Sequence, residues 1–427
     1  MDFIWGFMIQ LGHNMWYEPG DGPGLGKGGT LSEPRNRTEQ QVWDAVTECA
    51  ARKGANLMVI DLGEGLIYPS HPELAVAGSW TPEKLKKELA RLRRLGLEPV
   101  PKLNFSAKHD AWLKQYSRMV STETYYKVCA DLIADVCGIF HHPRYFHLGW
   151  DEERTGAQRK CQLLVTRQGD LWWHDMLFTA REVERHGARP WVWSDKNWVC
   201  RAEFKERMPK SILQSNCWYN RLKNFVRNDE EIAKRDWPGG WGASCSFLEL
   251  EEDGHDQVPC GSNVEDMDES FLALTRLAKV RIAPERLKGF LMAPWSCTYG
   301  KEPLKKQLEA CDILERAITE WNEDRLDVVI YGATQKGIDA AIKARRTFHE
   351  PILIDPAGDQ AVLNDWQIRN NGVLVKSGER LDRSRGSVAV ENGKIVSIRM
   401  ENGNVYRART FIDGTENGEL IAAMKGR

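Results

Sequence analysis

The sequence predicts an α/β protein made of two parts. Residues 1–322 are expected to form a (β/α)₈ TIM barrel, and residues 323–427 a small, truncated Rossmann-like α/β fragment. In the first part, short apolar segments alternate eight times with helical segments, as parallel βα units require. In the second part the pattern begins again with an apolar strand, a glycine-containing turn, a helix and another apolar strand.

The strands of the barrel are predicted from apolar runs that are too short for helices. They are expected at residues 3–12, 56–63, 97–105, 144–152, 189–195, 211–220, 255–263 and 287–298. The helices are predicted from amphipathic spacing and from their terminal residues. They are expected at residues 38–54, 81–96, 122–140, 170–187, 202–208, 246–254, 268–280 and 303–322.

Capping residues mark the first two of these helices. Thr38 precedes the first helix and Gly54 ends it, which predicts a threonine N-cap and a glycine stop. Thr81 precedes the second helix, Pro82 occupies its first position and Gly96 ends it. The remaining elements follow from the continued alternation of apolar and helical segments.

Composition and charge indicate a globular protein that binds neither nucleic acid nor membranes. Of the 427 residues, 42% are hydrophobic and 28% are charged, and the formal net charge is −2. No apolar run approaches the roughly 18 residues of a membrane span. The N-terminus shows no signal peptide, which predicts a cytoplasmic protein, although a chain trimmed at this end would look the same. The ten cysteines lack CxxC spacing, which predicts reduced thiols and no metal site.

Polar and aromatic residues gather where the predicted strands end. In a (β/α)₈ barrel these ends, and the loops that follow them, carry the working side chains. The residues at these positions are Gln10, His13, Asn14, Asp61, Glu64, Asn104, His109, Asp110, Asp151, Glu152, Trp193, Asp195, Asn216, Trp218, Tyr219, Ser262, Asn263 and Trp295. Acids and amides bind sugar hydroxyls and aromatic rings stack on sugar faces, so this mixture favours a carbohydrate partner.

One motif at the fourth strand end is more specific. The stretch His147-Leu148-Gly149-Trp150-Asp151-Glu152 resembles the His-x-Gly-Gly-Asp-Glu motif of family-20 glycoside hydrolases, the β-N-acetylhexosaminidases. The resemblance implies that Glu152 is the general acid/base for the glycosidic oxygen. It also implies that Asp151 orients the acetamido group of the substrate, which acts as the nucleophile. For this task the pKa of Glu152 should be raised by apolar neighbours such as Trp150.

Other segments extend the resemblance more loosely. In residues 100–109, Asn104 and His109 take the outer positions of the family's third-strand motif. The family lines its acetamido pocket with tryptophans and a tyrosine, for which Tyr219 or Tyr299 could serve. The substrate-binding residues that the resemblance implies are His147, Trp150, Asn104, His109, Trp193, Asp195, Trp218, Tyr219 and Trp295. The chain departs from the family at Trp150, where the motif has a glycine, and in lacking the arginine of the first strand.

Simpler interpretations of the same residues stay open. The acidic run could be a solvated helix start, and we expect Glu153 to face solvent or to cap the next helix. His147 could be a packed core histidine, and each tryptophan could serve in packing alone. Neighbouring acids such as Asp61 and Glu64 could bind a hard metal ion, but no loop signature supports one.

The last hundred residues contain a second pattern. Within residues 326–356, Gly332 and Gly337 frame a turn between a strand and a helix, and Asp355 ends the next strand. This segment resembles the N-terminal start of FAD-dependent oxidoreductases, which implies a cofactor site at these three residues. The second glycine-rich stretch and the substrate domain of that family are missing. We therefore expect no working flavoenzyme, and instead a remnant or an addition that packs against the barrel or mediates self-association.

The preferred hypothesis is a hexosaminidase-like glycoside hydrolase that acts on N-acetylhexosaminides by substrate-assisted, retaining catalysis. Hydrolysis of this kind needs no cofactor. The first alternative is a non-catalytic or repurposed carbohydrate-binding barrel. The second is an FAD-dependent oxidoreductase.

Overall fold

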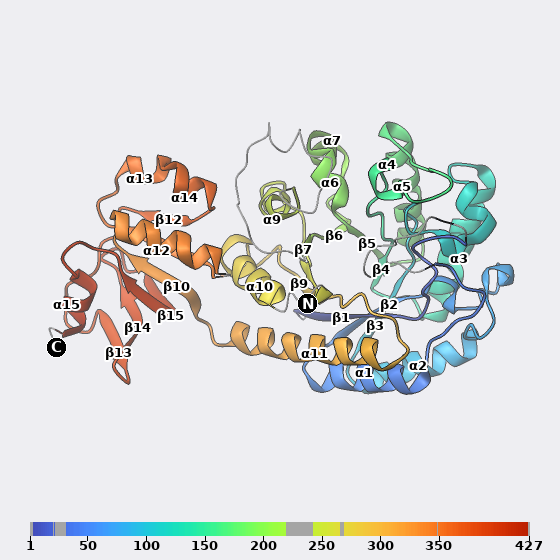
Figure 1. Cartoon of the computed structure of the whole chain (residues 1–427), viewed down its shortest axis with the longest axis horizontal. Coiled ribbons are helices and arrows are strands. Elements are labelled where there is room, and N and C mark those ends of the chain that lie inside the picture. Colours follow the sequence, from blue (N-terminus) through green and yellow to red (C-terminus); the bar gives the residue numbers. More distant parts are fainter. Residues whose placement is uncertain are drawn as a thin grey trace.

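The computed structural model describes residues 3–19, 21, 31–218, 242–264, 269–347 and 349–425. It contains two sheets, one in the barrel and one in a smaller C-terminal domain, which lie at opposite ends of the long axis of the molecule (Figure 1). The long helix α11 (Lys301–Asn322) leads from the barrel into the first strand of the C-terminal domain. The α/β fold class predicted from the sequence is therefore confirmed.

The barrel sheet is parallel throughout, in the order β6-β5-β4-β3-β2-β1-β9-β8-β7. Its strands are β1 (Ile4–Gln10), β2 (Leu57–Asp61), β3 (Glu98–Lys102), β4 (Tyr145–His147), β5 (Arg189–Trp193), β6 (Leu213–Ser215), β7 (Cys217–Trp218), β8 (Cys260–Gly261) and β9 (Gly289–Met292). The pieces β6 and β7 are separated by Asn216 alone and correspond to one predicted strand. Because β6 pairs with β5 and β7 pairs with β8, this strand joins the two edges and closes the barrel.

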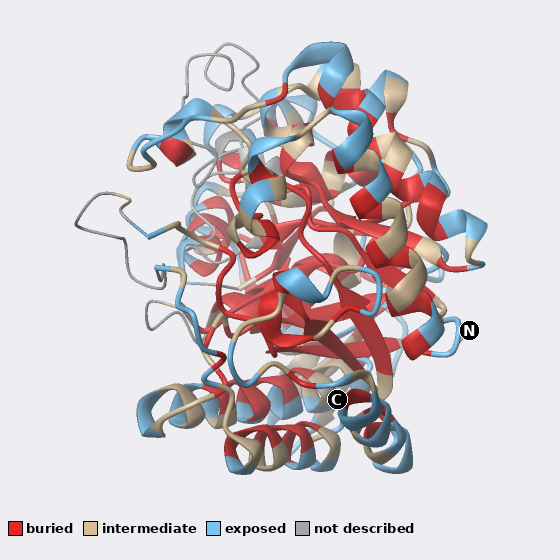
Figure 2. Cartoon of the chain, turned by 90° about the vertical axis from the view of Figure 1, so that its right-hand side faces the viewer, coloured by how far each residue is buried: buried red, intermediate tan, exposed pale blue. Residues whose placement is uncertain are grey.

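Helices surround the strands and bury one face each against them (Figure 2). They are α1 (Gln40–Arg52), α2 (Pro82–Arg94), α3 (Glu123–Ile139), α5 (Gly169–Arg185), α7 (Arg201–Arg207), α9 (Gly242–Glu252), α10 (Glu269–Arg281) and α11. The side chain of Thr81 caps α2 as predicted, by accepting a hydrogen bond from the Lys84 N–H at 3.2 Å. Thr38 was expected to cap α1, but its hydroxyl donates instead to the carbonyl of Leu11 at 2.9 Å.

The barrel has an inner and an outer apolar layer because strand side chains alternate between the two faces. Inside the barrel, residues such as Met8, Val59 and Trp191 form one cluster. Between strands and helices, residues such as Phe7, Ile60 and Leu89 form the larger cluster. At the carboxyl ends of β2 and β3, Asp61 and Lys102 point into the same interior and form a fully buried ion pair.

The C-terminal domain begins with the predicted strand, helix and strand. Its helices are α12 (Gln335–Arg346), α13 (Gln360–Asn364), α14 (Trp366–Asn370) and α15 (Glu419–Lys425). Its strands are β10 (Leu326–Tyr331), β11 (Pro351–Asp355), β12 (Leu374–Ser377), β13 (Val388–Glu391), β14 (Lys394–Arg399) and β15 (Val405–Asp413), in the order β12-β11-β10-β15-β14-β13. An Asn-Gly hairpin joins β13 to β14, and both Asn392 and Gly393 have positive φ, as such tight turns require.

The two domains are joined by ion pairs as well as by the chain. Glu320 on α11 pairs with Arg276 on α10 and with Arg409 on β15. Arg281 on α10 donates to Glu350, just before β11, at 2.9 Å. The C-terminal domain therefore packs against the barrel, which is one of the two roles expected for it. Within the described ranges, no helix has the length and apolar character needed to cross a membrane.

Candidate active site

The motif at the end of β4 lies at the mouth of the barrel, beside the loop that follows β3. Gly149 has a φ of +74°, and a Cβ atom there would lie 2.0 Å from Oδ1 of Asn104. Only glycine allows this close approach between the two loops. Trp150 and Glu152 also have positive φ, at 69° and 51°, which is rare for residues with side chains. The backbone therefore leaves β4 through a tightly constrained turn.

Asp151 is held by Asn104 and His109. The Asn104 Nδ2 donates to Asp151 Oδ1 at 2.8 Å, and His109 Nε2 lies 3.3 Å from Asp151 Oδ2. The amide of Asn104 is fixed in this direction because its own oxygen accepts from the backbone N–H groups of Ser106 and Trp150, at 3.1 Å and 3.3 Å. Asp151 therefore has one defined orientation in the mouth.

The environment keeps Asp151 ionised. Burial opposes the negative charge, but His109, Lys102 and Asn104 together hold the pKa of Asp151 well below its usual range. Burial likewise opposes the charge of His109, yet the Asp151 and Glu152 carboxylates raise the pKa of this imidazole. The ionised carboxylate of Asp151 thus favours the charged form of the His109 imidazole.

Glu152 is the more accessible of the two neighbouring acids. Its side chain is 37% exposed, against 13% for Asp151, and its Oε2 lies 3.5 Å from His109 Nε2. Burial acts to raise the pKa of Glu152, but the interaction with His109 outweighs it, so the pKa is lowered. The expectation of a raised pKa is therefore wrong for the free protein, because the nearest group is a cation rather than an apolar surface.

Asp195 supplies a third carboxyl group to the mouth, at the start of α6 (Asp195–Val199). Burial, followed by the charges of Asp151 and Glu152, raises its pKa well above the usual range, which favours the protonated form of this group. Asp195 and Glu152 line a small cavity with Trp198, of about 40 Å³. A cavity of that size can hold a water molecule.

Two of the predicted tryptophans also meet at the mouth. The ring of Trp193, at the end of β5, lies 5.8 Å from the ring of Trp295, which follows β9. Trp16, from the loop after β1, lies 6.2 Å from Trp295 and packs edge-on against His109 at 4.6 Å. Trp16 and Trp295 are partly exposed, whereas Trp193 is buried, and Trp16 is the ring that contacts His109, the partner of the two acids. The side chain of Trp218 and the whole of Tyr219 lie outside the described residues.

Two residues that were expected to contact substrate are placed elsewhere. His147 is fully buried inside the barrel, accepts the Gly149 N–H at 3.1 Å and has a pKa well below its usual range because of burial and Lys102. Trp150 turns outward, where its buried indole donates to Thr179 on α5 at 3.1 Å. Both side chains are thus held by contacts within the protein, and their contact with substrate stays a prediction.

Glu153 also contradicts its prediction. Rather than facing solvent, its carboxylate is buried and paired with Arg167, with a contact of 2.7 Å. Sequence reasoning missed Arg167, because nothing in the local pattern of residues 154–168 indicates a buried cation. It also missed Lys102, although a lysine inside the apolar run of a strand was an available signal.

The other strand-end acids support the loops. Glu64 accepts the backbone N–H groups of His13 and Asn14 at 2.7 Å and 3.0 Å, and burial raises its pKa to about 7. Asp61 is paired with Lys102, and burial raises the pKa of Asp110. Among the described residues, no group of three or more potential metal ligands is found.

The remaining strand-end residues make internal hydrogen bonds. The Asn216 side chain accepts from the Trp198 indole, the Ser262 hydroxyl accepts the Val264 N–H, and the Asn263 side chain donates to the carbonyl of Lys306. The main-chain carbonyl of Gln10 accepts the Thr298 hydroxyl. Tyr299, considered for the acetamido pocket, packs against His13 and under the guanidinium of Arg37. These residues shape the loops around the mouth.

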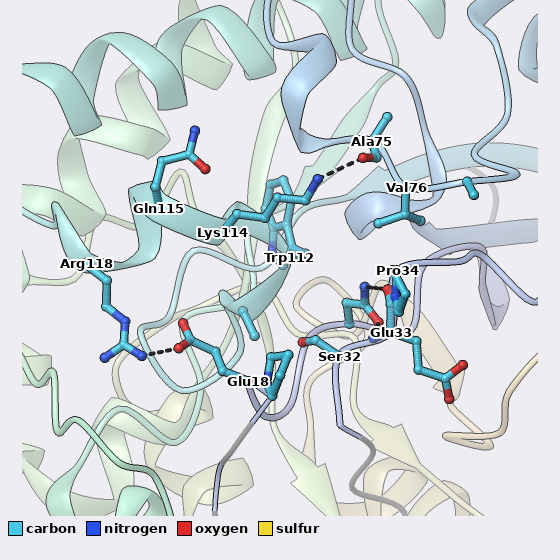
Figure 3. Close-up of a pocket in the computed structure, with 14 residues that line it drawn as sticks. Glu18, Ser32, Glu33, Pro34, Ala75, Val76, Trp112, Lys114, Gln115 and Arg118 are labelled. Atoms are coloured by element: carbon cyan, nitrogen blue, oxygen red, sulfur yellow. Dashed lines mark hydrogen bonds and ion pairs between the residues drawn. The ribbon is translucent and has the colours of Figure 1, made fainter.

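A cavity of about 760 Å³ lies beside this site (Figure 3). Two of its charged side chains already have partners: Lys114 donates to the carbonyl of Ala75 at 2.7 Å, and Arg118 pairs with Glu18. The indole of Trp112 lines it and donates to the backbone carbonyl of Asn104 at 3.1 Å. The cavity thus adjoins the loop that holds Asp151, but the acids of the mouth do not line it.

The predicted cofactor residues of the C-terminal domain are occupied by contacts within the domain. A Cβ atom at Gly337 would lie 2.0 Å from the carbonyl of Gly332, and one at Gly332 would lie 2.5 Å from the N–H of Thr415. Asp355 is buried, and its two oxygens accept the N–H groups of Ala357 and Asp359. The glycines therefore serve close chain packing, and the fusion to an FAD-dependent oxidoreductase is not supported.

No protein-family model matches the sequence, and no curated protein matches it significantly. The chain is similar to several solved structures. The β-N-acetylhexosaminidase of Bacteroides fragilis is 14% identical over 72% of this chain and 65% of its own, with a TM-score of 0.46. The β-hexosaminidase of Streptomyces plicatus is 12% identical over 73% of this chain and 63% of its own, with a TM-score of 0.49. Dispersin B is 14% identical over 75% of this chain and all of its own, with a TM-score of 0.47. The chain thus spans less than two thirds of the first two proteins, and likeness at these identities concerns the fold alone.

Proposed function

We propose that the protein is a glycoside hydrolase of the hexosaminidase type, which cleaves N-acetylhexosaminides with retention. The observation that supports this proposal most is that the two neighbouring acids differ in exposure and in hydrogen bonding. Asp151 is ionised and fixed by Asn104 at 2.8 Å, whereas Glu152 is more exposed and lies beside the same imidazole at 3.5 Å. One acid is thus suited to orient a group, and the other to exchange protons with a substrate.

In the proposed reaction the substrate supplies the nucleophile. Asp151 accepts a hydrogen bond from the acetamido N–H, which directs the acetamido oxygen to the anomeric carbon. Glu152 donates a proton to the departing glycosidic oxygen, and then takes a proton from the water that opens the cyclic intermediate. Trp16 and Trp295, which are partly exposed, offer apolar faces to the sugar, whereas Trp193 is buried behind Trp295.

Glu152 must be protonated at the start of this sequence. In the free structure its pKa is lowered. A sugar bound over the site would cover the exposed part of this side chain and exclude water, and desolvation favours the neutral form of a carboxyl group. Binding of substrate therefore prepares the acid.

The test is hydrolysis of aryl N-acetyl-β-glucosaminide by wild type, Glu152→Gln and Asp151→Asn. Loss of one acid should lower kcat by about 100-fold or more. The matched substrate is the aryl β-glucoside, which lacks the acetamido group and should be cleaved far more slowly. Equal rates for wild type and Glu152→Gln would remove the catalytic assignment.

A non-catalytic carbohydrate-binding barrel is the second candidate. It is favoured by the lowered pKa of Glu152, since an ionised carboxylate accepts hydrogen bonds from sugar hydroxyls. Calorimetry with N-acetylglucosamine separates the two candidates. Binding without any hydrolysis by wild type would establish this second function.

A further inference from the structure

Arg167 is a buried arginine in the segment before α5, and it makes a two-sided contact with one carboxylate. Its backbone N–H and its Nε donate to Oε1 of Glu153 at 2.8 Å and 2.9 Å. Its Nη2 donates to Oε2 of the same residue at 2.7 Å. This parallel arrangement of a guanidinium and a carboxylate is geometrically specific, and lysine cannot reproduce it.

The same guanidinium reaches two further elements. Its Nη2 donates to the carbonyl of Phe105, after β3, at 2.7 Å, and its Nη1 donates to Asp175 on α5 at 3.0 Å. Its Cζ lies 4.3 Å from the centre of the Trp150 ring. Arg167 therefore connects the loops after β3 and β4 to the helix behind them.

Glu153 connects the two loops from the other side. Its Oε2 accepts the backbone N–H of Ala107 at 2.8 Å. Ala107 stands two residues before His109, and Glu153 directly follows Glu152. The Glu153–Arg167 pair thus joins the segment that carries the imidazole to the segment that carries the two acids, at the point where Glu152 has a positive φ.

We propose that Arg167 is a positioning residue that fixes the separation between His109 and the carboxylates of Asp151 and Glu152. Its effect on catalysis rests on the proposed function. Its effect on the geometry of the mouth does not, and can be measured without any substrate.

The charged groups around His109 decide how this can be measured. Asp151 and Glu152 face it from the loop after β4, Lys108 precedes it in the chain, and Asp61 acts on it from β2. The aromatic neighbour is Trp16. If the loops separate, the attraction of the carboxylates weakens and the pKa of His109 falls. Removing the positive charge of Arg167 would instead raise the pKa of His109, because a repulsive cation would be lost. The test therefore needs variants that keep every charge.

The variants are Arg167→Lys and Glu153→Asp, which keep both charges but break the two-sided contact. The pKa of His109 is followed by NMR of ring-labelled histidine in the full chain, with His109→Gln to assign the signal. We expect a lower pKa for His109 in both variants. Arg185→Lys, on the exposed side of α5, is the matched control and should leave the value unchanged.

Activity provides the second measurement. Misplacement of an acid by about 1 Å can lower a rate by about 100-fold, so we expect kcat to fall 10- to 100-fold in both variants while KM changes little. Thermal unfolding verifies that each variant is folded. An unchanged pKa of His109 in the folded variants would overturn the proposal, and so would failure of both to fold, which would assign Arg167 to stability alone. An inactive wild type with a shifted His109 pKa in the variants would remove the hydrolase but keep the positioning role.

Discussion

His109 Nε2 lies 3.3 Å from Oδ2 of Asp151, in a site that buries the imidazole almost completely. The pKa of His109 is raised and that of Asp151 is lowered, so each group stabilises the charged form of the other. A group whose pKa is raised on folding stabilises the folded state at pH values below its pKa in the unfolded chain. This stabilisation is lost as the pH rises through its pKa in the folded protein. A group whose pKa is lowered on folding stabilises the folded state at pH values above its pKa in the unfolded chain. This stabilisation is lost as the pH falls through its pKa in the folded protein.

The first prediction follows from these signs. The contribution of the pair is fully present between about pH 4 and about pH 6.5, the unfolded pKa values of the two side chains. His109→Gln should therefore destabilise the protein most near pH 5, and progressively less as pH rises through the pKa of His109. Urea unfolding from pH 4 to pH 9 measures this, with the exposed His141→Gln as control. A pH-independent difference would show that the pair is not charged.

Gly149→Ala tests the contact between the loops. The substitution combines a φ of +74° with a Cβ atom placed 2.0 Å from Asn104. Gly187→Ala is the matched control, because its φ is +78° and nothing lies within 4 Å of the added atom. The control should lose about 1–2 kcal/mol of unfolding free energy through the backbone alone. Gly149→Ala should lose about 1–3 kcal/mol more through overpacking. Equal losses in urea unfolding would mean that Asn104 can move away freely.

The sequence predicted the positions of strands and helices better than the directions of side chains in the site. Apolar runs indicated the strands and Thr81 indicated the start of α2, because the residues that decide burial and capping lie close together in the sequence. The fourth strand was expected at residues 144–152, which placed Asp151 and Glu152 at its end. The strand instead ends at His147, and positive φ values at Gly149, Trp150 and Glu152 set the directions that follow.

The remaining wrong predictions concern residues whose partners lie far away in the sequence. Glu153 is buried because Arg167, far along the loop, neutralises it. The glycines of the C-terminal turn approach Gly414 and Thr415, which lie about 80 residues away in the chain and are adjacent only in the fold. No spacing rule within a single segment could indicate these contacts, since tertiary packing supplies the partner.

Lys102→Met tests the ion pair inside the barrel. Both side chains are fully buried, with Nζ of Lys102 bonded to Oδ2 of Asp61. Removing the cation leaves an unpaired buried carboxylate, which should cost about 3–5 kcal/mol. The double variant Asp61→Leu/Lys102→Met should lose less than the single variant, because no charge remains without a partner. Urea unfolding of the two single variants and the double variant measures the coupling, and additive losses would contradict it.

Asp195→Asn tests the protonated carboxyl group beside the two acids. Burial, Asp151 and Glu152 raise its pKa, so the folded protein holds a proton that the unfolded chain releases above about pH 4. Because the folded state binds more protons, Asp195 lowers the stability of wild type as pH rises from about 4 toward its folded pKa. The amide introduced by the substitution is not titratable, and it replaces a neutral carboxyl group of nearly the same shape. The Tm of Asp195→Asn relative to wild type should therefore increase with pH over this range, whereas the exposed Asp170→Asn should show no such trend. A constant Tm difference would mean that Asp195 is ionised in the folded protein.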